Sequence, residues 1–498
     1  QRQMCIRDRH EIEHYMCCPF DVITHFRMLK RIRDVYYKHF SHLGINIEYA
    51  CGAISNQAAD IIVDTKNYYR HSKETLKSEI DWIKIGANIS ACPRHCKLMF
   101  LTKEAIWKED LGINETDPEF LKIVHQLADS FTKNGIEDKS SFLDKVEEYA
   151  EIFFKLYVED QKNPQQSSQQ GSQQQSGQQG PQQQSGQQGS QQQSGQWGVG
   201  RPKDGDEHGN AFVFADPDKV KEAIEVLAEE TSVEEFIDLL AIAGIIGMSD
   251  KQKGVLWFNV QSANIIPIVE FSNTGNKSSY TYPSVWRIGD PIEELDLMLT
   301  YMTSPRLIPG MTTKKWGYVS NDDNGTESKQ MDLLLVVDTS GSMGSAMKES
   351  ANMHQAVLAS YGILSYFEST KSKVAFIGFS DKIDAYVDWS DKYDDVRERL
   401  LTNGHGGTKF PISRIKSTLD VRSRDLVTVL ITNGDLGNIN ESVSYFRDYL
   451  NDDNKLYIFL LGGSKSLHSY EPLKNIGAKI YNANNANEFC DMVLTDME

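Results

Sequence analysis

The sequence predicts a chain of two unlike halves: a mainly α-helical N-terminal region and a doubly wound α/β domain at the C-terminus. From residue 331 onward, short apolar runs alternate with amphipathic segments, which is typical of a mainly parallel sheet covered by helices. Between residues 20 and 160, apolar residues recur at helical spacing instead. A segment rich in Gln, Ser and Gly, residues 161–205, separates the two patterns.

The composition excludes several classes of function. The 498 residues are 40% hydrophobic and 24% charged, which is ordinary for a globular protein. A net charge of -18 argues against nucleic-acid binding, because neutralising phosphates requires clustered Lys and Arg. The longest apolar stretch, near residues 239–248, is too short to span a membrane. Seven cysteines without regular pairing favour free thiols, so we expect a cytoplasmic protein.

Residues 1–9, which read QRQMCIRDR, look foreign to the protein. They resemble the translation of a sequencing adapter, and no starting Met precedes them. We therefore expect that the protein's own residues start here at His10 and that the gene is truncated just before it. A genuine N-terminal arm is the alternative.

Residues 10–14 read H-E-I-E-H, with two histidines one helical turn apart. Positions i and i+4 share a helix face, so His10 and His14 could bind one Zn²⁺. Glu11 would lie beside the open position of the metal and could take a proton from zinc-bound water. This is the layout of zinc metallopeptidases, and a chance match on a surface helix is the alternative. Pro19 predicts that this helix ends or kinks just before it.

A zinc site of this kind requires a third protein ligand, for which His25, Asp60 and Asp64 are candidates. Residues 56–64 predict a helix on which the two acids, four residues apart, lie on one side. Small residues in this segment permit the close approach of a neighbouring helix. We favour Asp60. The alternatives are a solvated helix face for the acids and an ordinary contact between helices for His25.

The middle of the chain is less regular. Residues 161–205 contain a repeated Q-Q-S-G-Q-Q-G unit that cannot form an apolar core, so we expect a disordered linker, either between domains or inside one. Residues 206–330 predict an α+β region that connects the halves and packs against the C-terminal domain. The elements expected in it are helices at 219–228 and 233–243 and strands or extended segments at 255–260 and 265–271.

The C-terminal domain begins with an apolar run, residues 333–337, that predicts a strand buried on both faces. It ends abruptly in D-T-S-G-S, residues 338–342, and ligands of open α/β sheets bind at the carboxyl ends of strands. Hydroxyl and carboxylate oxygens are ligands that Mg²⁺ prefers. Further strands are expected at 374–379, 385–389, 426–432, 456–461 and near 479–481, and helices at 347–367, 396–401, up to 419 and at 443–450.

The D-x-S-x-S turn, the G-G-T of residues 406–408 and the I-T-N-G after the fourth strand resemble a von Willebrand factor A (VWA) domain over residues 331–498. The resemblance implies a metal-ion-dependent adhesion site (MIDAS) in which Ser340, Ser342 and Thr408 bind Mg²⁺ directly. Asp338 would bind it directly or through water. Neutral hydroxyls leave the ion electron-poor, so an open position would attract a carboxylate from a protein partner. The alternative is that the hydroxyls only cap helices and turns.

One position departs from the family pattern. Asn433 stands where VWA domains carry Asp in I-T-D-G. An amide oxygen can still accept a hydrogen bond from metal-bound water. The lost negative charge should weaken binding of the bare ion and strengthen attraction for a partner's acid. Asp435, two residues later, is a candidate for compensation.

Taken together, H-E-I-E-H, the N-x-A-A-D of residues 56–60 and the C-terminal D-T-S-G-S are similar to predicted prokaryotic metallopeptidases with a C-terminal VWA-like domain. The resemblance implies a zincin-like region at residues 10–160, a zinc-dependent peptidase whose VWA domain recruits its substrate. In similar proteins the usual partner is an AAA+ ATPase of the MoxR type. The alternative function is therefore a non-enzymatic adaptor of such an ATPase, in a chaperone or metal-insertion role, with an inactive H-E-x-x-H region. Nothing in the N-terminal half supports a chelatase subunit.

Overall fold

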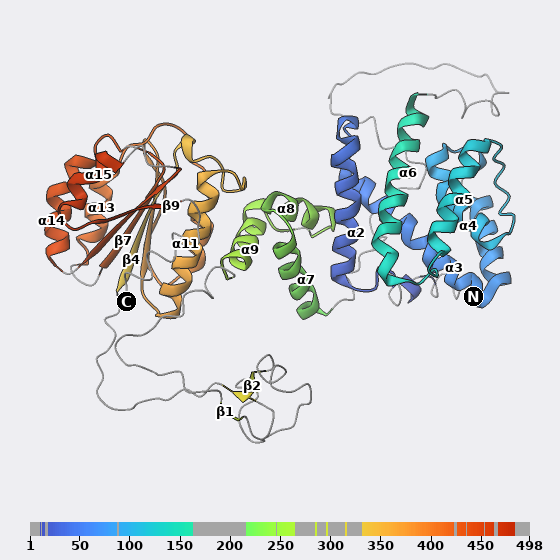
Figure 1. Cartoon of the computed structure of the whole chain (residues 1–498), viewed down its shortest axis with the longest axis horizontal. Coiled ribbons are helices and arrows are strands. Elements are labelled where there is room, and N and C mark those ends of the chain that lie inside the picture. Colours follow the sequence, from blue (N-terminus) through green and yellow to red (C-terminus); the bar gives the residue numbers. More distant parts are fainter. Residues whose placement is uncertain are drawn as a thin grey trace, which may run out of the picture. The chain divides into compact units, whose positions relative to one another are not determined.

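The computed structural model divides the chain into two compact units, residues 1–253 and residues 254–498, each considered by itself (Figure 1). It describes residues 10, 12–14, 18–86, 89–162, 216–245, 247–263, 284–285, 295–296, 314–315, 331–422, 426–434, 436–452, 454–462 and 467–483. Outside the described residues lie Glu11, Asp435, residues 1–9, which we expect to be foreign, residues 265–271, for which we expect an extended segment, and residues 163–205 of the expected linker.

The N-terminal unit is built of helices, as predicted. They are α2 (Val22–Val35), α3 (Ile47–Gly86, with non-helical backbone at His71), α4 (Arg94–Trp107), α5 (Pro118–Thr132), α6 (Phe142–Lys162), α7 (Pro217–Glu230) and α8 (Val233–Ile242). Short turns of helix at Tyr36–Phe40, Ser41–Leu43, Ile89–Ala91 and Lys139–Ser141 connect them.

Several of these helices begin at a residue whose side chain caps the free backbone N–H groups. The Asp117 carboxylate accepts hydrogen bonds from the backbone of Glu119 and Phe120, and Pro118 occupies the first turn of α5. Ser232 and Glu235 form a reciprocal capping box at the start of α8. The helix starts are thus specified locally, independently of the packing that follows.

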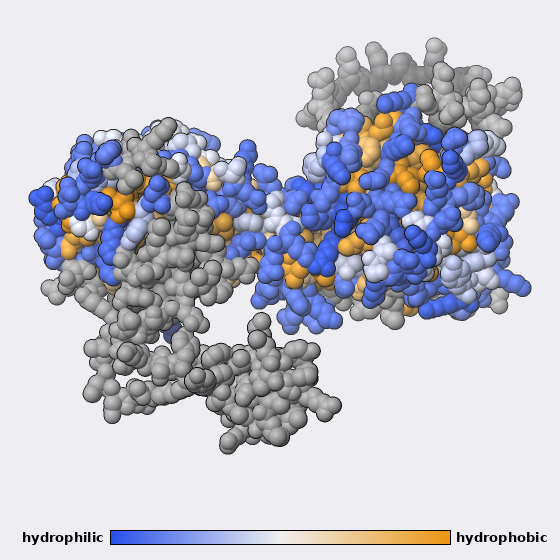
Figure 2. Space-filling model, viewed as in Figure 1, coloured by the Kyte–Doolittle hydropathy of each residue, from blue (hydrophilic) through white to orange (hydrophobic). Residues whose placement is uncertain are grey.

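Packing of apolar faces holds the unit together. Helix α2 packs against α3, α6 and α7, and α4 packs against α3, α5 and α6. The largest fully buried side chains include Phe26, Phe120, Phe131, Tyr149 and Phe153. Full burial of an aromatic or aliphatic side chain contributes about 1.5–3 kcal/mol. On the face seen in Figure 2, the surface is mostly hydrophilic with smaller apolar areas between, in keeping with a core that takes most of the apolar residues.

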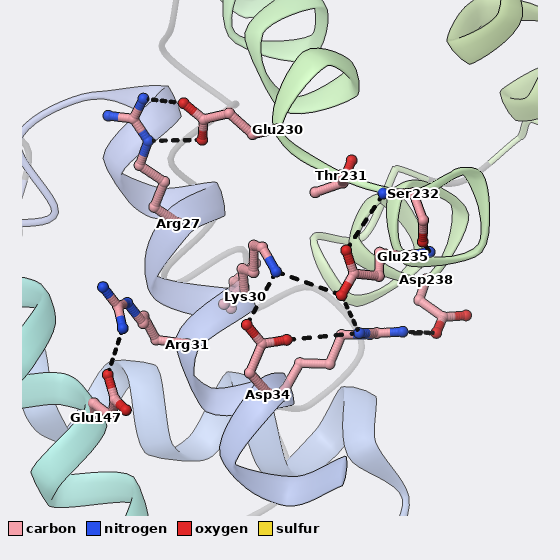
Figure 3. A network of polar contacts seen from close by, with 12 residues as sticks. Arg27, Lys30, Arg31, Asp34, Glu147, Glu230, Thr231, Ser232, Glu235 and Asp238 are labelled. Carbon is pink, nitrogen blue, oxygen red and sulfur yellow. Dashed lines mark hydrogen bonds and ion pairs between the residues drawn. The ribbon is translucent and has the colours of Figure 1, made fainter. Parts of the chain in front are cut away.

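Helices α7 and α8, which follow the Gln-rich segment in sequence, pack against α2 in this same unit. Figure 3 shows the ion pairs between them. Arg27 binds the Glu230 carboxylate with two nitrogens, and Lys30 Nζ lies 3.4 Å from Glu235 Oε1. The Gln-rich segment therefore connects two parts of one unit. The division after residue 253 falls inside the region 206–330 that we expected to connect the halves.

Arg33 is the most buried cation of this contact. Its side chain is 10% exposed, its Nη2 lies 2.7 Å from Asp238 Oδ2, and its Nη1 lies 3.3 Å from Glu235 Oε1. We expect Arg33→Met to lower the free energy of unfolding of the unit by about 1–3 kcal/mol, measured by urea denaturation. Breaking a buried pair costs about 3–5 kcal/mol, and the partial exposure of Glu235 and the exposure of Asp238 reduce that figure.

Arg31→Met is the matched control. Arg31 pairs with Glu147 at 2.6 Å, and both side chains are exposed. Exposed pairs contribute about 0–1 kcal/mol, so this variant should remain close to the unchanged protein. Equal losses in the two variants would contradict the role given to Arg33.

The C-terminal unit contains the doubly wound sheet, which confirms the predicted α/β class. Its strands are β4 (Asp332–Asp338), β5 (Val374–Phe379), β6 (Ile383–Ser390), β7 (Leu426–Thr432), β8 (Lys455–Leu461) and β9 (Lys479–Ala483). Their order is β6-β5-β4-β7-β8-β9. All neighbours pair in parallel except β5 and β6, which are antiparallel. The two-residue strands β1 (Ser284–Val285), β2 (Leu295–Asp296) and β3 (Lys314–Lys315) form a separate antiparallel sheet.

Helices lie on both faces of this sheet (Figure 1). One face forms a continuous apolar core with α13 (Ile412–Leu419), α14 (Val443–Asn451) and α15 (Leu467–Lys474). On the other face α11 (Asn352–Ser369) packs against β4, with α12 (Tyr393–Leu400) beside it. The strands β5 and β6 are added on one side of β4, and β7, β8 and β9 are added on the other side. The carboxyl ends of β4 and β7 therefore form the topological switch point of the sheet.

The expected strand at 255–260 is wrong, because these residues belong to helix α9 (Asp250–Ala263). A short apolar run such as V-L-W-F-N-V fits a buried helix as well as a strand. Here Trp257 and Phe258 both contact the ring of His354 on α11, and Phe258 also contacts Tyr361. In the part of the chain that the structure describes, no helix has the length and apolar character needed to cross a membrane.

Candidate metal sites

In the N-terminal unit, the structure brings His10 and His14 against Asp60 of α3. His14 Nε2 lies 3.0 Å from His10 Nε2 and 3.0 Å from Asp60 Oδ1. His10 Nε2 lies 3.5 Å from the same carboxylate oxygen. Asp60 Oδ1 is thus close to the Nε2 atoms of both imidazoles.

The separations suit a tetrahedral metal. Zinc bonds to nitrogen and oxygen of 2.0–2.1 Å imply about 3.3–3.4 Å between neighbouring ligand atoms, which is close to the three distances observed. Two imidazoles and one carboxylate form the ligand set of catalytic zinc sites, in which the fourth position belongs to water or substrate. The donor chemistry and spacing of His10, His14 and Asp60 therefore fit Zn²⁺.

Each histidine turns its other ring nitrogen toward an acceptor. His10 Nδ1 lies 2.8 Å from Asp64 Oδ1, and His14 Nδ1 lies 3.4 Å from the backbone oxygen of Cys18. With Nδ1 carrying the proton, both rings have an Nε2 lone pair available for a metal. The second acid of the α3 pair, Asp64, thus contacts a proposed ligand instead of joining the group of three.

A buried charge network continues from Asp64. Lys103 of α4 is 1% exposed and lies 2.8 Å from Asp64 Oδ2, and it also binds Glu79. Burial lowers the pKa of His10, but the hydrogen bond and charge of Asp64, with the charge of Asp60, raise it more, to about 9. Burial raises the pKa of Asp64, but the charge of Lys103 and the hydrogen bond from His10 lower it well below its ordinary range.

The remaining N-terminal candidates lie elsewhere or are not described. His25 is buried on α2 and is not one of the three grouped residues, and burial lowers its pKa to about 4. Glu11 lies outside the described residues. Its neighbour Glu13 binds Lys66 at 3.0 Å and also pairs with Arg70, which ties the H-E-I-E-H segment to α3.

In the C-terminal unit, Asp338 ends β4 with a side chain that is fully buried. Its Oδ1 accepts a hydrogen bond from the Ser340 backbone N–H at 2.9 Å, and its Oδ2 accepts one from Thr432 Oγ1 at 2.7 Å. Thr432 is the last residue of β7. The carboxylate therefore fixes the turn after β4 to the end of the neighbouring strand.

Beyond this carboxylate, three side-chain oxygens form a row. Ser340 Oγ lies 3.1 Å from Ser342 Oγ, which lies 3.1 Å from Asn433 Oδ1. The Asn433 amide donates to the Ser342 backbone oxygen at 2.8 Å, which fixes the orientation of its side chain. Mg²⁺ bonds of 2.0–2.1 Å imply about 3 Å between adjacent ligands of an octahedron, so these oxygens fit that ion.

The glycine-rich loop meets the same turn. The Gly341 backbone N–H donates to the Gly406 backbone oxygen at 3.4 Å, and Thr408, half-buried, follows two residues later. Gly404 has no room for a side chain, because a Cβ there would lie 2.5 Å from the Thr339 backbone oxygen. Glycine therefore allows the loop to approach the turn. Thr408 lies on the loop that contacts the turn, while Asp435 lies outside the described residues.

Sequence reasoning missed Lys103 and Glu79, which lie behind the imidazole site. Lys103 stands in an otherwise apolar stretch of α4, L-M-F-L-T-K, and nine of its neighbours on that helix are buried. A cation within a buried helix is rare without a partner, so this position was a usable signal. Its partners lie 39 and 24 residues away in sequence and no local pattern identifies them.

No family model matches the sequence, and no curated protein is significantly similar to it. Solved structures show a weak VWA-like similarity over about a third of the chain. The conserved hypothetical protein BatB from Bacteroides thetaiotaomicron is 12% identical over 34% of this chain and 97% of its own, with a TM-score of 0.29. A von Willebrand factor type A protein from Catenulispora acidiphila is 9% identical over 34% of this chain and 42% of its own, with a TM-score of 0.25. An uncharacterized membrane spanning protein from Vibrio fischeri is 17% identical over 33% and 96%, with a TM-score of 0.15.

Proposed function

We propose that the C-terminal domain binds an acidic residue of a protein partner through Mg²⁺ held at the carboxyl ends of β4 and β7. The observation that carries this proposal is the row of Ser340, Ser342 and Asn433 oxygens, each 3.1 Å from the next, at the topological switch point of the sheet. Thr408 and Asp338 complete the proposed set. Bound Mg²⁺ would supply a positive charge and an open position for a carboxylate.

The residues have separate roles in this proposal. The two oxygens of Asp338 are taken by Ser340 and Thr432, so the carboxylate mainly holds the turn in place and contributes a nearby negative charge. The serine and threonine hydroxyls and the Asn433 amide are neutral, and they leave most of the charge of the ion uncompensated. A site of this charge favours an acidic partner group over a neutral one. The sequence resemblance suggests an AAA+ ATPase of the MoxR type as the partner.

Asn433→Asp tests the role of the neutral amide. We expect this variant to bind Mg²⁺ at least about tenfold more tightly, since a unit charge a few ångströms from the ion contributes on the order of 1–4 kcal/mol. Isothermal titration of the full chain with Mg²⁺ measures the change. Asn438→Asp is the matched control, because its amide also donates to a backbone oxygen, that of Phe410, outside the site. Unchanged or weaker Mg²⁺ binding in Asn433→Asp would contradict the proposed ligand set.

We propose further that His10, His14 and Asp60 hold Zn²⁺ and that the N-terminal unit is a zinc-dependent peptidase. The specific observation in favour is the near-tetrahedral spacing of three ligand atoms contributed by two helical segments. Bound zinc would polarise a peptide carbonyl and activate a water molecule. Glu11 would accept the proton of that water. The VWA-like domain would then recruit the substrate or the partner that delivers it.

A further inference from the structure

Two acids of α3, Asp60 and Asp64, stand one helical turn apart and both contact His10. We propose that Lys103 determines their different roles. Its ammonium group holds Asp64 as an orienting partner of His10 and leaves Asp60 as the metal ligand. This inference rests on the proposed zinc site and goes beyond it, because it assigns a positioning role to residues that do not touch the metal.

Both carboxylate oxygens of Asp64 already have partners. Its Oδ1 lies 2.8 Å from His10 Nδ1, and its Oδ2 lies 2.8 Å from Lys103 Nζ. Both oxygens therefore have a charged or strongly polar partner, and the side chain is only 11% exposed. An acid held at both oxygens in this way has no oxygen directed at the space between the two imidazoles.

Asp60 is held differently. Its Oδ2 accepts a hydrogen bond from the neutral Asn56 amide at 3.2 Å, and its Oδ1 faces His14 and His10 at 3.0 and 3.5 Å. A neutral donor leaves the negative charge of this carboxylate available. The two acids therefore differ in their partners: Asp64 binds the Lys103 cation, and Asp60 binds the neutral Asn56 amide.

Lys103 is fixed by the fold rather than by the site. It is 1% exposed on α4, and Glu79, farther along α3, binds the same ammonium group. A buried ammonium is costly without compensation, so two carboxylates at its head keep it in place. The position of Asp64, and with it the ring orientation of His10, is consequently set by the packing of α4 on α3.

The contact with Asp64 determines which nitrogen of the His10 ring is available to a metal. A proton on Nδ1 that is donated to Asp64 leaves Nε2 as the metal-binding nitrogen, and Nε2 is the atom that faces His14 and Asp60. Removing the acid that accepts this proton should leave the three ligands present but the ring less well oriented. Loss of an orienting partner of this kind typically weakens metal binding by about 10–100-fold.

The test measures Zn²⁺ affinity of the full chain by competition with a chromogenic chelator, in Asp64→Ala, Asp60→Ala and Glu79→Gln. We expect Asp64→Ala to bind zinc about 10–100-fold more weakly than the unchanged protein. The zinc affinity of Asp60→Ala should fall further, because this variant lacks a ligand. Glu79→Gln keeps a side-chain oxygen that can accept from Lys103 and leaves Lys103 on Asp64, so its zinc affinity should fall less than that of Asp64→Ala. The absorption spectrum of the Co²⁺-loaded protein should change in Asp64→Ala, because the ligand field depends on the orientation of His10.

The outcomes separate this inference from the proposed zinc site. If the unchanged chain binds no zinc, the zinc site is wrong and the inference falls with it. If Asp60→Ala loses zinc while Asp64→Ala keeps both its affinity and its Co²⁺ spectrum, only the role given to Lys103 is overturned. If Asp64→Ala loses more zinc than Asp60→Ala, the two acids have the opposite roles. Lys103→Met alone would leave Glu79 without its cation and Asp64 with only His10 as a partner. The double variant Lys103→Met with Glu79→Gln removes the uncompensated charge at residue 79. Once thermal unfolding shows that this double variant folds, its zinc affinity should fall as much as that of Asp64→Ala.

Discussion

Replacing Ser340 and Ser342 together by alanine should abolish Mg²⁺ binding by the C-terminal domain. The two hydroxyls are adjacent members of the oxygen row, 3.1 Å apart, and neither contributes to the apolar core. A hydrogen bond or ligand contact to a charged group contributes about 1.5–3 kcal/mol, so two lost contacts should weaken binding by about 100-fold or more. Isothermal titration of the full chain with Mg²⁺ should then show no measurable heat at concentrations that saturate the unchanged protein.

Ser365→Ala with Ser369→Ala provides the matched control. Both serines lie on α11 of the same domain and donate their hydroxyls to backbone oxygens of Tyr361 and Tyr366 within their own helix. This pair removes the same atoms outside the site and should leave Mg²⁺ binding unchanged. Thermal unfolding should give the same midpoint for the Ser340/Ser342 variant as for the unchanged protein in the absence of Mg²⁺. Normal binding in a folded Ser340/Ser342 variant would show that the metal, if bound, lies elsewhere.

Zinc should be lost when His14 is replaced by alanine. Its Nε2 lies 3.0 Å from both other ligand atoms, so this residue is the centre of the group. Two remaining ligands, His10 and Asp60, do not make a zinc site of the usual three or four protein ligands. After dialysis against a weak chelator, metal analysis should find about one zinc per unchanged chain and close to none in His14→Ala.

His125→Ala is the control for general effects of removing an imidazole, because His125 is exposed on α5, outside the group. It should retain zinc. Equal zinc contents in His14→Ala and the unchanged chain would exclude the H-E-I-E-H segment as the metal site. Absence of zinc from the unchanged chain would favour the adaptor function, in which the N-terminal unit only supports a metal-dependent contact of the C-terminal domain.

The parts of the structure that sequence could predict are those with a local cause. The strand that ends at Asp338 is a continuous apolar run, and the alternation of strands and helices dictates a mainly parallel sheet. The i,i+4 spacing placed His10 and His14 on one helix face, and N-x-A-A-D drew attention to Asp60. In each of these cases the periodicity of the backbone determines which side chains share a face.

The parts that could not be predicted depend on contacts between distant segments. Lys103 reaches Asp64 and Glu79 from another helix, and only the packing of α4 on α3 brings them together. The docking of α8 on α2 through Arg33 joins residues more than 200 positions apart. The apolar run of α9 does not by itself distinguish a helix from a strand, because the side chains that bury it belong to α11.

Mg²⁺ held by Ser340, Ser342, Thr408 and Asn433, as we propose, should keep one position open for a carboxylate. The direct measurement loads the full chain with Mn²⁺, which takes oxygen ligands as Mg²⁺ does, and follows the relaxation of water protons while acetate is added. If acetate takes the open position, it displaces bound water, and the relaxation enhancement should fall in a saturable manner that is absent in the Ser340/Ser342 double variant. An enhancement that stays constant while Mn²⁺ remains bound would contradict the claim, because the metal would then have no position for a partner's acid.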